Sequence, residues 1–461
     1  MFLFALVVGY MSTYWFAGLY PLDWINIDSK LVSFCIVFFV WVILGIFLAL
    51  PISLWIVVVR LCQLKNKFYI GIYFALAWIF LEYFRAWIMA IGLYSPQVVF
   101  GPHHAYYSLG YLGSGIPYLK ELLPMGGMYL TAFVIVLVNY FLFLACIYFK
   151  KRENKNQIIS IFFLILVLVS FSNIYMNHLR KSGQANIFNF YLGNSNLPST
   201  KDKNIYNLKS ELGVQKINEI ISKNDTSNLF ILPENVDVYS KFVKDKKTFA
   251  KDISVVGSYT GKKERMFSLD TVISQSSFYD KKILMPIGEY NISYISFFTQ
   301  FSKVMGNSMP RVEKGEGSNV LNLNGISFVG SICSENISPY LFRNGVRDGG
   351  AVLVNIASHA PFGYSGLLDK QTIAINTTRA LETGRYFITA TNVGNSFVIS
   401  DEGKLTFKTK DLKDELSFSE NFAYTKSYKT PYVKFGDYIV YIALAFFFNY
   451  FVYVFKRSRI P

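Results

Sequence analysis

Long apolar runs gather toward the two ends of the chain and leave a stretch of mixed polarity between them. Six runs are long enough to cross a bilayer as helices, because one span needs about 20 apolar residues. They are Phe2–Tyr20, Leu31–Val59, Phe68–Ile91, Met128–Phe149, Ile158–Tyr175 and Tyr438–Phe455. The pattern predicts about five spans within residues 1–178 and one within residues 436–461. The first run lacks a basic start and a small-residue cleavage site, so we interpret it as a retained anchor.

Basic residues cluster after the second, fourth and last apolar runs. Lysine and arginine are enriched on the cytoplasmic side of membrane proteins, and six crossings put all three clusters on one side. We therefore expect both termini in the cytoplasm, and residues 92–127 and 180–435 on the outer side. The clusters are Arg60, Lys65 and Lys67; Lys150, Lys151, Arg152 and Lys155; and Lys456, Arg457 and Arg459.

Residues 180–435 alternate short β-rich runs with helical patterns. Runs rich in Ile, Val, Phe and Leu that end at Gly, Pro or Asn are typical of strands. The predicted strands are Asn186–Leu192, Asn228–Leu232, Lys282–Met285, Ile326–Ser331, Ala351–Ile356 and Phe387–Ala390, and the predicted helices are Lys203–Ser222 and Leu367–Thr383. This alternation predicts a layered α/β domain with its catalytic groups at strand ends.

The composition favours a membrane protein. Of 461 residues, 52% are hydrophobic and 16% are charged, which is too apolar for an ordinary soluble protein. The net charge of +15 suggests nucleic acid, but many basic residues flank apolar runs and no nucleic-acid-binding motif is present. The four histidines show no metal-ligand spacing. We therefore expect no metal, no cofactor and no nucleic-acid partner.

Cys333 is the one cysteine of the polar region. Cys35 and Cys146 fall inside apolar runs and Cys62 ends one, as expected of small buried hydrophobic residues. Because Cys333 has no partner in its own region, it cannot form a disulfide there. Its presence needs another explanation.

Three polar residues at or beside predicted strand ends can form a nucleophilic site: Glu234, Lys281 and Cys333. A thiol has a reference pKa of about 8.5, so a nucleophilic cysteine needs a base to take its proton and a cation to favour the thiolate. Glu234 is the candidate base and Lys281 the candidate cation, and the same lysine can stabilise an oxyanion. Taken singly, each residue type is more often solvated or inert.

The motifs around these residues resemble those of the nitrilase superfamily. They read Leu-Pro-Glu-Asn at 232–235, Tyr-x-Lys-x-x-Leu-x-Pro-x-Gly-Glu at 279–289 and Cys-x-Glu at 333–335. Together with the flanking apolar runs, they are similar to the membrane branch of that superfamily, the bacterial apolipoprotein N-acyltransferases. Further likeness lies at 82–87 (Glu-Tyr-Phe-Arg-Ala-Trp), 124–127 (Pro-Met-Gly-Gly), 379–385 (Arg-Ala-Leu-Glu-Thr-Gly-Arg) and 390–394 (Ala-Thr-Asn-Val-Gly).

The resemblance implies a fold and a set of residue roles. The fold is a multi-span α-helical membrane domain with an α/β nitrilase-like αββα sandwich, and the domains are 1–178, 180–435 and the C-terminal span 436–461. Glu234 is then the general base, Lys281 the oxyanion-stabilising cation and Cys333 the nucleophile. Glu289 is a second carboxylate that orients Lys281 or shares its proton traffic, and Glu335 is a nearby supporting residue.

The resemblance also implies an activity and a location. The expected reaction moves a fatty acyl group from a membrane phospholipid, through a thioester on Cys333, to the N-terminal amine of a diacylglyceryl-cysteine lipoprotein. The expected location is the bacterial inner membrane, with the catalytic domain facing the periplasm or exterior.

Two departures from the family pattern keep other functions open. Ser334 stands where the family usually has an aromatic residue, and 358–363 reads Ser-His-Ala-Pro-Phe-Gly instead of a typical Asn-Asp-Ala-Trp-Phe-Gly. The alternatives are a membrane-tethered amidase with water as the acceptor, and a catalytically idle paralogue that binds lipoproteins. A Cys-His protease with His359 as the base is a third. A hydrophobic groove open to lipid would favour the acyltransferase over the amidase.

Overall fold

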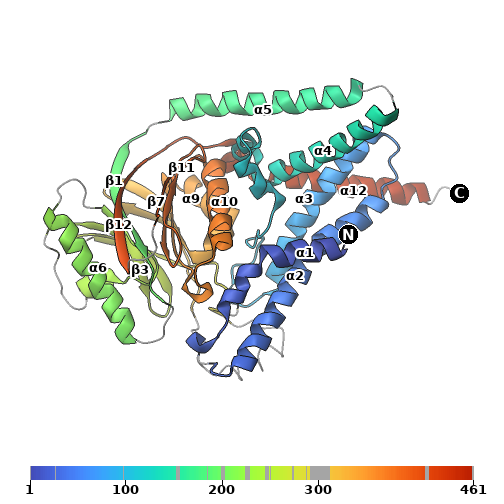
Figure 1. The fold of residues 1–461 in the computed structure, drawn as a ribbon. Helices are drawn as coiled ribbons and strands as arrows, with labels where there is room; N and C mark the ends of the chain where they lie inside the picture. Colours follow the sequence, from blue (N-terminus) through green and yellow to red (C-terminus); the bar gives the residue numbers. More distant parts are fainter. Residues whose placement is uncertain are drawn as a thin grey trace.

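The chain divides into a helical part and a part built on β-strands. The computed structural model describes residues 2–25, 27–96, 98–151, 156–183, 185–198, 203–223, 229–243, 249, 251–271, 275–286, 288–290, 312–410 and 415–458. In Figure 1 the helical part carries the labels of both chain ends, and the strands lie beside it.

Four described helical stretches are long and apolar enough to cross a membrane: 30–60, 67–92, 119–148 and 162–182. They belong to helices α2 (Lys30–Arg60), α3 (Lys67–Gly92), α4 (Leu123–Lys151) and α5 (Asn156–Ser182). They confirm the second to fifth predicted runs, so the chain is a multi-pass membrane protein. The sixth run forms α12 (Tyr438–Ser458), in which Tyr438–Val452 is a shorter apolar helix.

The first predicted span, Phe2–Tyr20, is wrong as a single crossing helix. Helix α1 covers Phe2–Ser12, and the chain continues into the 3-10 helices η1 (Tyr14–Leu19) and η2 (Asp23–Ile25). At 1.5 Å per residue, the 11 residues of α1 cover roughly 16 Å, about half of the hydrocarbon thickness. Instead, α1 packs against the middle of α2, where Gly9 approaches Gly45 closely.

The second part of the molecule is one folded sheet with the order β5-β4-β3-β2-β1-β9-β8-β7-β6, to which β12 pairs at β1 and β10 at β9. From β3 through β2, β1, β9 and β8 to β7, neighbouring strands run parallel, so their C-terminal ends share one edge. The strands are β1 (Ile187–Ser195), β2 (Leu229–Ile231), β3 (Ser254–Thr260), β4 (Glu264–Asp270), β5 (Gln275–Asp280), β6 (Val320–Leu323), β7 (Ile326–Ile332), β8 (Val352–Ser358), β9 (Phe387–Asn392), β10 (Phe397–Ile399), β11 (Leu405–Lys408) and β12 (Leu416–Tyr424).

The sheet folds on itself, and helices cover its two outer faces. Buried apolar side chains from both halves meet in the inner layer, among them Phe190, Met266 and Phe328. Two helices pack on one outer face and two on the other, which confirms the predicted αββα sandwich. They are α6 (Lys203–Lys223) and α7 (Val238–Val243) on one side, and α9 (Pro339–Arg347) and α10 (Gly366–Thr383) on the other.

Most predicted elements of this domain are confirmed. The predicted strands at β1, β2, β7, β8 and β9 and both predicted helices are present, although Asn228 lies outside the described residues. The predicted strand Lys282–Met285 is wrong, because β5 ends at Asp280 and the backbone N–H groups of Lys282 and Ile283 donate to the Glu335 carboxylate instead of a neighbouring strand.

Helix α10 joins the strand domain to the membrane helices. The backbone of α4 is kinked at Gly126 and Gly127, and Gly127 has a φ of 69°, a conformation that favours glycine. The kink directs the N–H of Met128 to Oε1 of Glu382 on α10 (2.8 Å). Glu382 also forms a fully buried ion pair with Arg379 (3.2 Å). This contact holds the C-terminal end of α10 against α4.

Candidate active site

Three strand ends bring the predicted catalytic residues to one edge of the sandwich. Glu234 follows β2, Cys333 directly follows β7, and Lys281 directly follows β5. Strand β5 is antiparallel to β4, and β4 is antiparallel to β3, so β5 points the same way as β3 and β2. Side chains beyond these C-terminal ends therefore converge, as expected of an α/β domain.

Lys281 is fully buried between two carboxylates. Its Nζ donates to Oε2 of Glu264 (2.8 Å) and to Oε1 of Glu289 (2.5 Å). Glu289 is in turn held by the N–H of Met285 at its second oxygen (2.9 Å). Burial lowers the pKa of Lys281, but the two carboxylates raise it more, so that the net shift is well upward. The site thus favours a charged ammonium group that is fully buried among protein atoms.

Glu289 contacts Lys281 directly and belongs to the same charged cluster. Burial raises the pKa of Glu289 to about 7, while Lys281 lowers it and Glu264 raises it again. Near neutral pH the two carboxylates therefore compete for one ammonium group.

Glu234 is a buried carboxyl group with a free oxygen. Its Oε2 has no hydrogen-bond partner among the described residues. Burial raises the pKa of Glu234 well above its usual value, and Glu264 raises it further, whereas Lys281 and the backbone of Ser358 lower it. A carboxylate with a raised pKa and an open oxygen is suited to accept a proton.

Cys333 begins the short 3-10 helix η6 (Cys333–Ile337) in a left-handed backbone conformation, with a φ of 51°. Such a conformation is uncommon for a residue with a side chain and is typical of functional sites. Nδ2 of Asn355, on the neighbouring strand β8, donates to the Cys333 carbonyl (3.1 Å) and fixes this turn.

The thiol of Cys333 is protonated at rest. Burial raises its pKa the most, Glu234 raises it further, and Lys281 lowers it without reversing the shift. Lys281 by itself favours the thiolate, but desolvation and the surrounding carboxylates outweigh one ammonium. The proton must leave as the sulfur attacks, so a base is needed beside it. Glu234, Lys281 and Cys333 lie close enough to affect one another electrostatically.

Glu335 positions the segments that carry Lys281 and Cys333. Its Oε1 accepts from the Tyr279 hydroxyl (2.6 Å) and from the N–H groups of Lys282 (2.8 Å) and Ile283 (3.0 Å). Its Oε2 accepts from the N–H of Ile332, one residue before the cysteine (2.8 Å). One fully buried carboxyl group thus ties the end of β5 to the end of β7.

Glu264 belongs to the site and was missed in the sequence. It stands in no motif, and its place opposite Lys281 follows from the register of the β4–β5 hairpin, in which Arg265 pairs with Asp280. The sequence could have indicated Glu264 only if the pairing of β4 with β5 had been known, because a carboxylate at the start of β4 then lies opposite Lys281.

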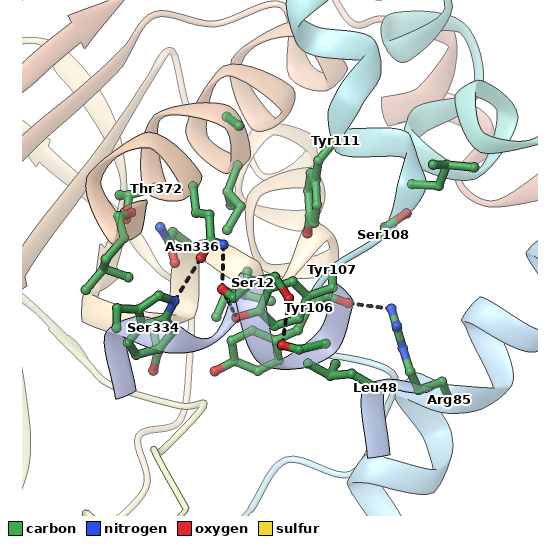
Figure 2. Close-up of a pocket in the computed structure, with 18 of the residues that line it drawn as sticks. Ser12, Leu48, Arg85, Tyr106, Tyr107, Ser108, Tyr111, Ser334, Asn336 and Thr372 are labelled. Carbon is green, nitrogen blue, oxygen red and sulfur yellow. Dashed lines mark hydrogen bonds between the residues drawn. The ribbon is translucent and has the colours of Figure 1, made fainter. Parts of the chain in front are cut away.

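An apolar cavity of about 400 Å³ joins Cys333 to the membrane helices. Figure 2 shows Tyr106, Tyr107 and Tyr111 around it, from the loop after α3, together with Ser334 next to the nucleophile. Helix α1, too short to cross the membrane, is part of the wall. The helical part contributes Ala5, Val8 and Gly9 from α1, Leu48 and Ile52 from α2, and Trp78 and Arg85 from α3.

The Glu82 and Arg85 side chains of α3 hold the loop that forms one wall of this cavity. Glu82 accepts from the Ser108 hydroxyl (2.7 Å) and the N–H of Leu109 (2.8 Å). Arg85 donates to the backbone oxygen of Tyr106. The two residues of the Glu-x-x-Arg-x-Trp motif thus shape the cavity.

His359 lines the cavity and is the base that a cysteine-histidine protease would need. No described residue hydrogen-bonds its ring, and the groups that shift the pKa of Cys333 are Lys281 and three carboxyl groups. The geometry therefore favours a glutamate-lysine-cysteine site over a cysteine-histidine one.

Comparisons with known proteins agree with this fold and geometry. A sequence model described as carbon-nitrogen hydrolase matches residues 203–421. An apolipoprotein N-acyltransferase of a Synechocystis species is 26% identical, over 94% of this chain and 85% of its own. Enzymes of the same name from Prochlorococcus marinus and Geobacter metallireducens are 25% and 27% identical, over 70% and 77% of this chain and 64% and 70% of theirs.

The fold and the buried glutamate-lysine-cysteine cluster define a carbon-nitrogen hydrolase domain. With its membrane helices, the chain is similar over most of its length to apolipoprotein N-acyltransferases, which are acyltransferase enzymes.

Proposed function

We propose that this protein transfers a fatty acyl group from a membrane phospholipid to the N-terminal amine of a diacylglyceryl-cysteine lipoprotein. The observation that carries the proposal is the apolar cavity between Cys333 and the membrane helices. A fatty acyl chain is long and apolar, and a cavity lined by Val8, Leu48 and Ile52 suits it. Both proposed substrates are lipids, so they would reach the site by lateral diffusion.

In the first half-reaction, Cys333 is the proposed nucleophile. Its sulfur attacks the ester carbonyl while Glu234 takes the thiol proton. The negative charge on the carbonyl oxygen is stabilised by the buried ammonium of Lys281, held in place by Glu264 and Glu289. The carbon–oxygen bond then breaks, and the leaving lysophospholipid oxygen takes the proton from Glu234. The product is an acyl thioester on Cys333.

In the second half-reaction, the acceptor amine attacks that thioester. The carbon–nitrogen bond forms and the carbon–sulfur bond breaks. Glu234 accepts the proton that the nitrogen loses and returns it to the sulfur of Cys333. The site is then restored, with amide as the product.

An amidase with water as the acceptor is the second candidate, because the same residues can serve hydrolysis. The apolar lining favours the acyltransferase, since excluding water protects a thioester from hydrolysis. The third candidate is an idle lipoprotein-binding paralogue, suggested by Ser334 beside the nucleophile.

The proposed location is the bacterial inner membrane, with the catalytic domain on the periplasmic or outer side. Helices α2, α4 and α12 each run toward a basic cluster, and these clusters share one side whether or not α1 crosses. Arg152, Lys155 and Arg459 of these clusters lie outside the described residues. The cytoplasmic N-terminus expected above required six crossings and is not part of the proposal.

A product analysis tests the proposal. The purified protein is incubated with a phospholipid that carries an isotope-labelled acyl chain and with a diacylglyceryl-cysteine peptide. We expect the label in an amide on the peptide, with little free fatty acid. Labelled free fatty acid without labelled peptide would point to the hydrolase. The absence of both products would point to the idle paralogue.

A further inference from the structure

His359 occupies a prepared position in the wall of the cavity. It directly follows β8, its N–H donates to the backbone oxygen of Asn392 (2.8 Å), and its own carbonyl accepts from the N–H of Phe362 (2.9 Å). The imidazole lies against Gly394, where a Cβ atom would stand 2.8 Å from Nδ1. Glycine at this position leaves the space that the ring fills.

His359 lies two residues beyond Ala357, the position next to β7 that is level with Cys333. Strands β7 and β8 are parallel and pair Ile332 with Ile356, so Cys333 and Ala357 are the next residues of each chain. Side chains alternate along a strand. Accordingly, Asn355, Ala357 and His359 all line the cavity, in a row that begins beside Cys333.

Two atoms of this row are free hydrogen-bond acceptors. Nδ2 of Asn355 donates to the carbonyl oxygens of Ser331 (3.3 Å) and Cys333 (3.1 Å), which can only accept, so the amide orientation is determined. Its Oδ1 is buried and has no partner among the described residues. Burial lowers the pKa of His359 to about 4 against a smaller opposing effect of Asp369, so the ring is neutral near pH 7 and keeps one unprotonated nitrogen.

These acceptors match one of the two substrates. The reacting ester of a phospholipid offers oxygen acceptors and no donor, so it cannot bind them. An amine carries two or three N–H donors and can bind both. A neutral imidazole also tolerates an ammonium group that an imidazolium would repel.

On the basis of the proposed function, we propose that His359, with Oδ1 of Asn355, forms the subsite that holds the acceptor amine beside the thioester carbon on Cys333. His359 is thus a specificity residue for an acceptor with a free primary amine. It takes no part in forming the thioester.

Equilibrium binding to the inactive Cys333→Ala protein tests this subsite without any turnover. The probes are a diacylglyceryl-cysteine peptide with a free N-terminus and the same peptide with that amine acetylated. We expect the free amine to bind about tenfold to a hundredfold more tightly, the worth of a hydrogen bond to a charged group. In Cys333→Ala/His359→Phe this preference should fall to nearly one, and His359→Gln, which keeps an acceptor oxygen, should recover part of it.

His103→Phe is the matched control, because the His103 ring binds the Ser338 hydroxyl (2.9 Å) and does not line the cavity. It should keep the full preference. The inference is overturned if Cys333→Ala/His359→Phe also keeps the preference for the free amine, or if Cys333→Ala with His359 intact binds both peptides equally. If the preference depends on His359 but the wild-type protein forms no thioester with phospholipid, the inference stands and the proposed acyl transfer fails.

Discussion

Replacing Lys281 with methionine separates two roles of the ammonium group, one in the stability of the fold and one in the chemistry of the site. The variant Lys281→Met keeps most of the side-chain volume but removes the charge that lies between Glu264 and Glu289, 2.8 and 2.5 Å away. Breaking a buried ion pair from one side costs about 3–5 kcal/mol of unfolding free energy, because the remaining charge is buried without a partner. The midpoint of thermal unfolding should therefore fall by several degrees.

The chemical part is measured as the rate of thioester formation on Cys333. Removing one preorganised donor from an oxyanion site costs about 10²- to 10³-fold in rate. We expect at least this loss of rate in Lys281→Met. The rate is measured by mass spectrometry of the intact protein after incubation with phospholipid.

A compensated variant tells the two parts apart. In Lys281→Met/Glu264→Gln/Glu289→Gln the two carboxylates become neutral amides, so no unpaired charge remains. Replacing a whole buried ionic group by neutral residues is often nearly neutral in stability. We expect the unfolding midpoint to recover most of its loss, while thioester formation stays as slow as in Lys281→Met. Recovery of both quantities would refute the reasoning, because Lys281 would then serve only to neutralise its neighbours.

Three further changes test other parts of the site. Glu234→Gln should abolish thioester formation without lowering the unfolding midpoint, since the free Oε2 has no described partner to lose. In the wild-type protein the rate of thioester formation should fall as pH drops, with a midpoint above 4.5, because the raised pKa of Glu234 makes this base take up a proton at a higher pH than an ordinary glutamate does. A midpoint at or below 4.5 would exclude Glu234 as the base. Glu335→Gln should cost about 1–3 kcal/mol of unfolding free energy and slow thioester formation, because the new amide N–H₂ faces the N–H of Ile332; a wild-type rate would exclude its positioning role. Val8→Trp should slow the reaction of a long-chain phospholipid more than that of a short-chain one by filling the cavity wall at α1, and equal rates for both would place the acyl chain elsewhere.

Most of the parallel strands of the sandwich could be predicted from the sequence. Strands β7, β8 and β9 carry several large apolar residues each and are buried along most of their length, as is typical of parallel strands covered on both faces. Strands β3, β4 and β5 were missed because they carry many polar residues, which the fold pairs with one another. For example, the hydroxyl groups of Ser268 and Ser277 lie 2.6 Å apart across the β4–β5 hairpin.

The first apolar run misled the prediction for a local reason. Hydropathy counts side chains and does not register where a helix ends. The Ser12 hydroxyl (2.9 Å) and the Thr13 hydroxyl (2.8 Å) both donate to the backbone oxygen of Gly9. Serine and threonine compete in this way with the helical backbone pattern. The helix ends at Ser12, and α1 becomes a wall of the cavity instead of a span.

The motif residues Glu234, Lys281 and Cys333 could be predicted from the sequence, whereas the surroundings that set their chemistry could not. Glu264 reaches Lys281 through a hairpin register, and the cavity is assembled from α1, α2, α3, β8 and α10. The protonated state of the thiol follows from burial, which no motif records.

The mass of the Cys333 peptide, measured after the purified protein has been incubated with phospholipid in the absence of an acceptor, tests the central claim most directly. The account predicts an increase equal to one acyl group on this peptide, its release by hydroxylamine at neutral pH, and no increase in Cys333→Ala. An acyl group found on a different residue, or acyl transfer by Cys333→Ala at the wild-type rate, would contradict it.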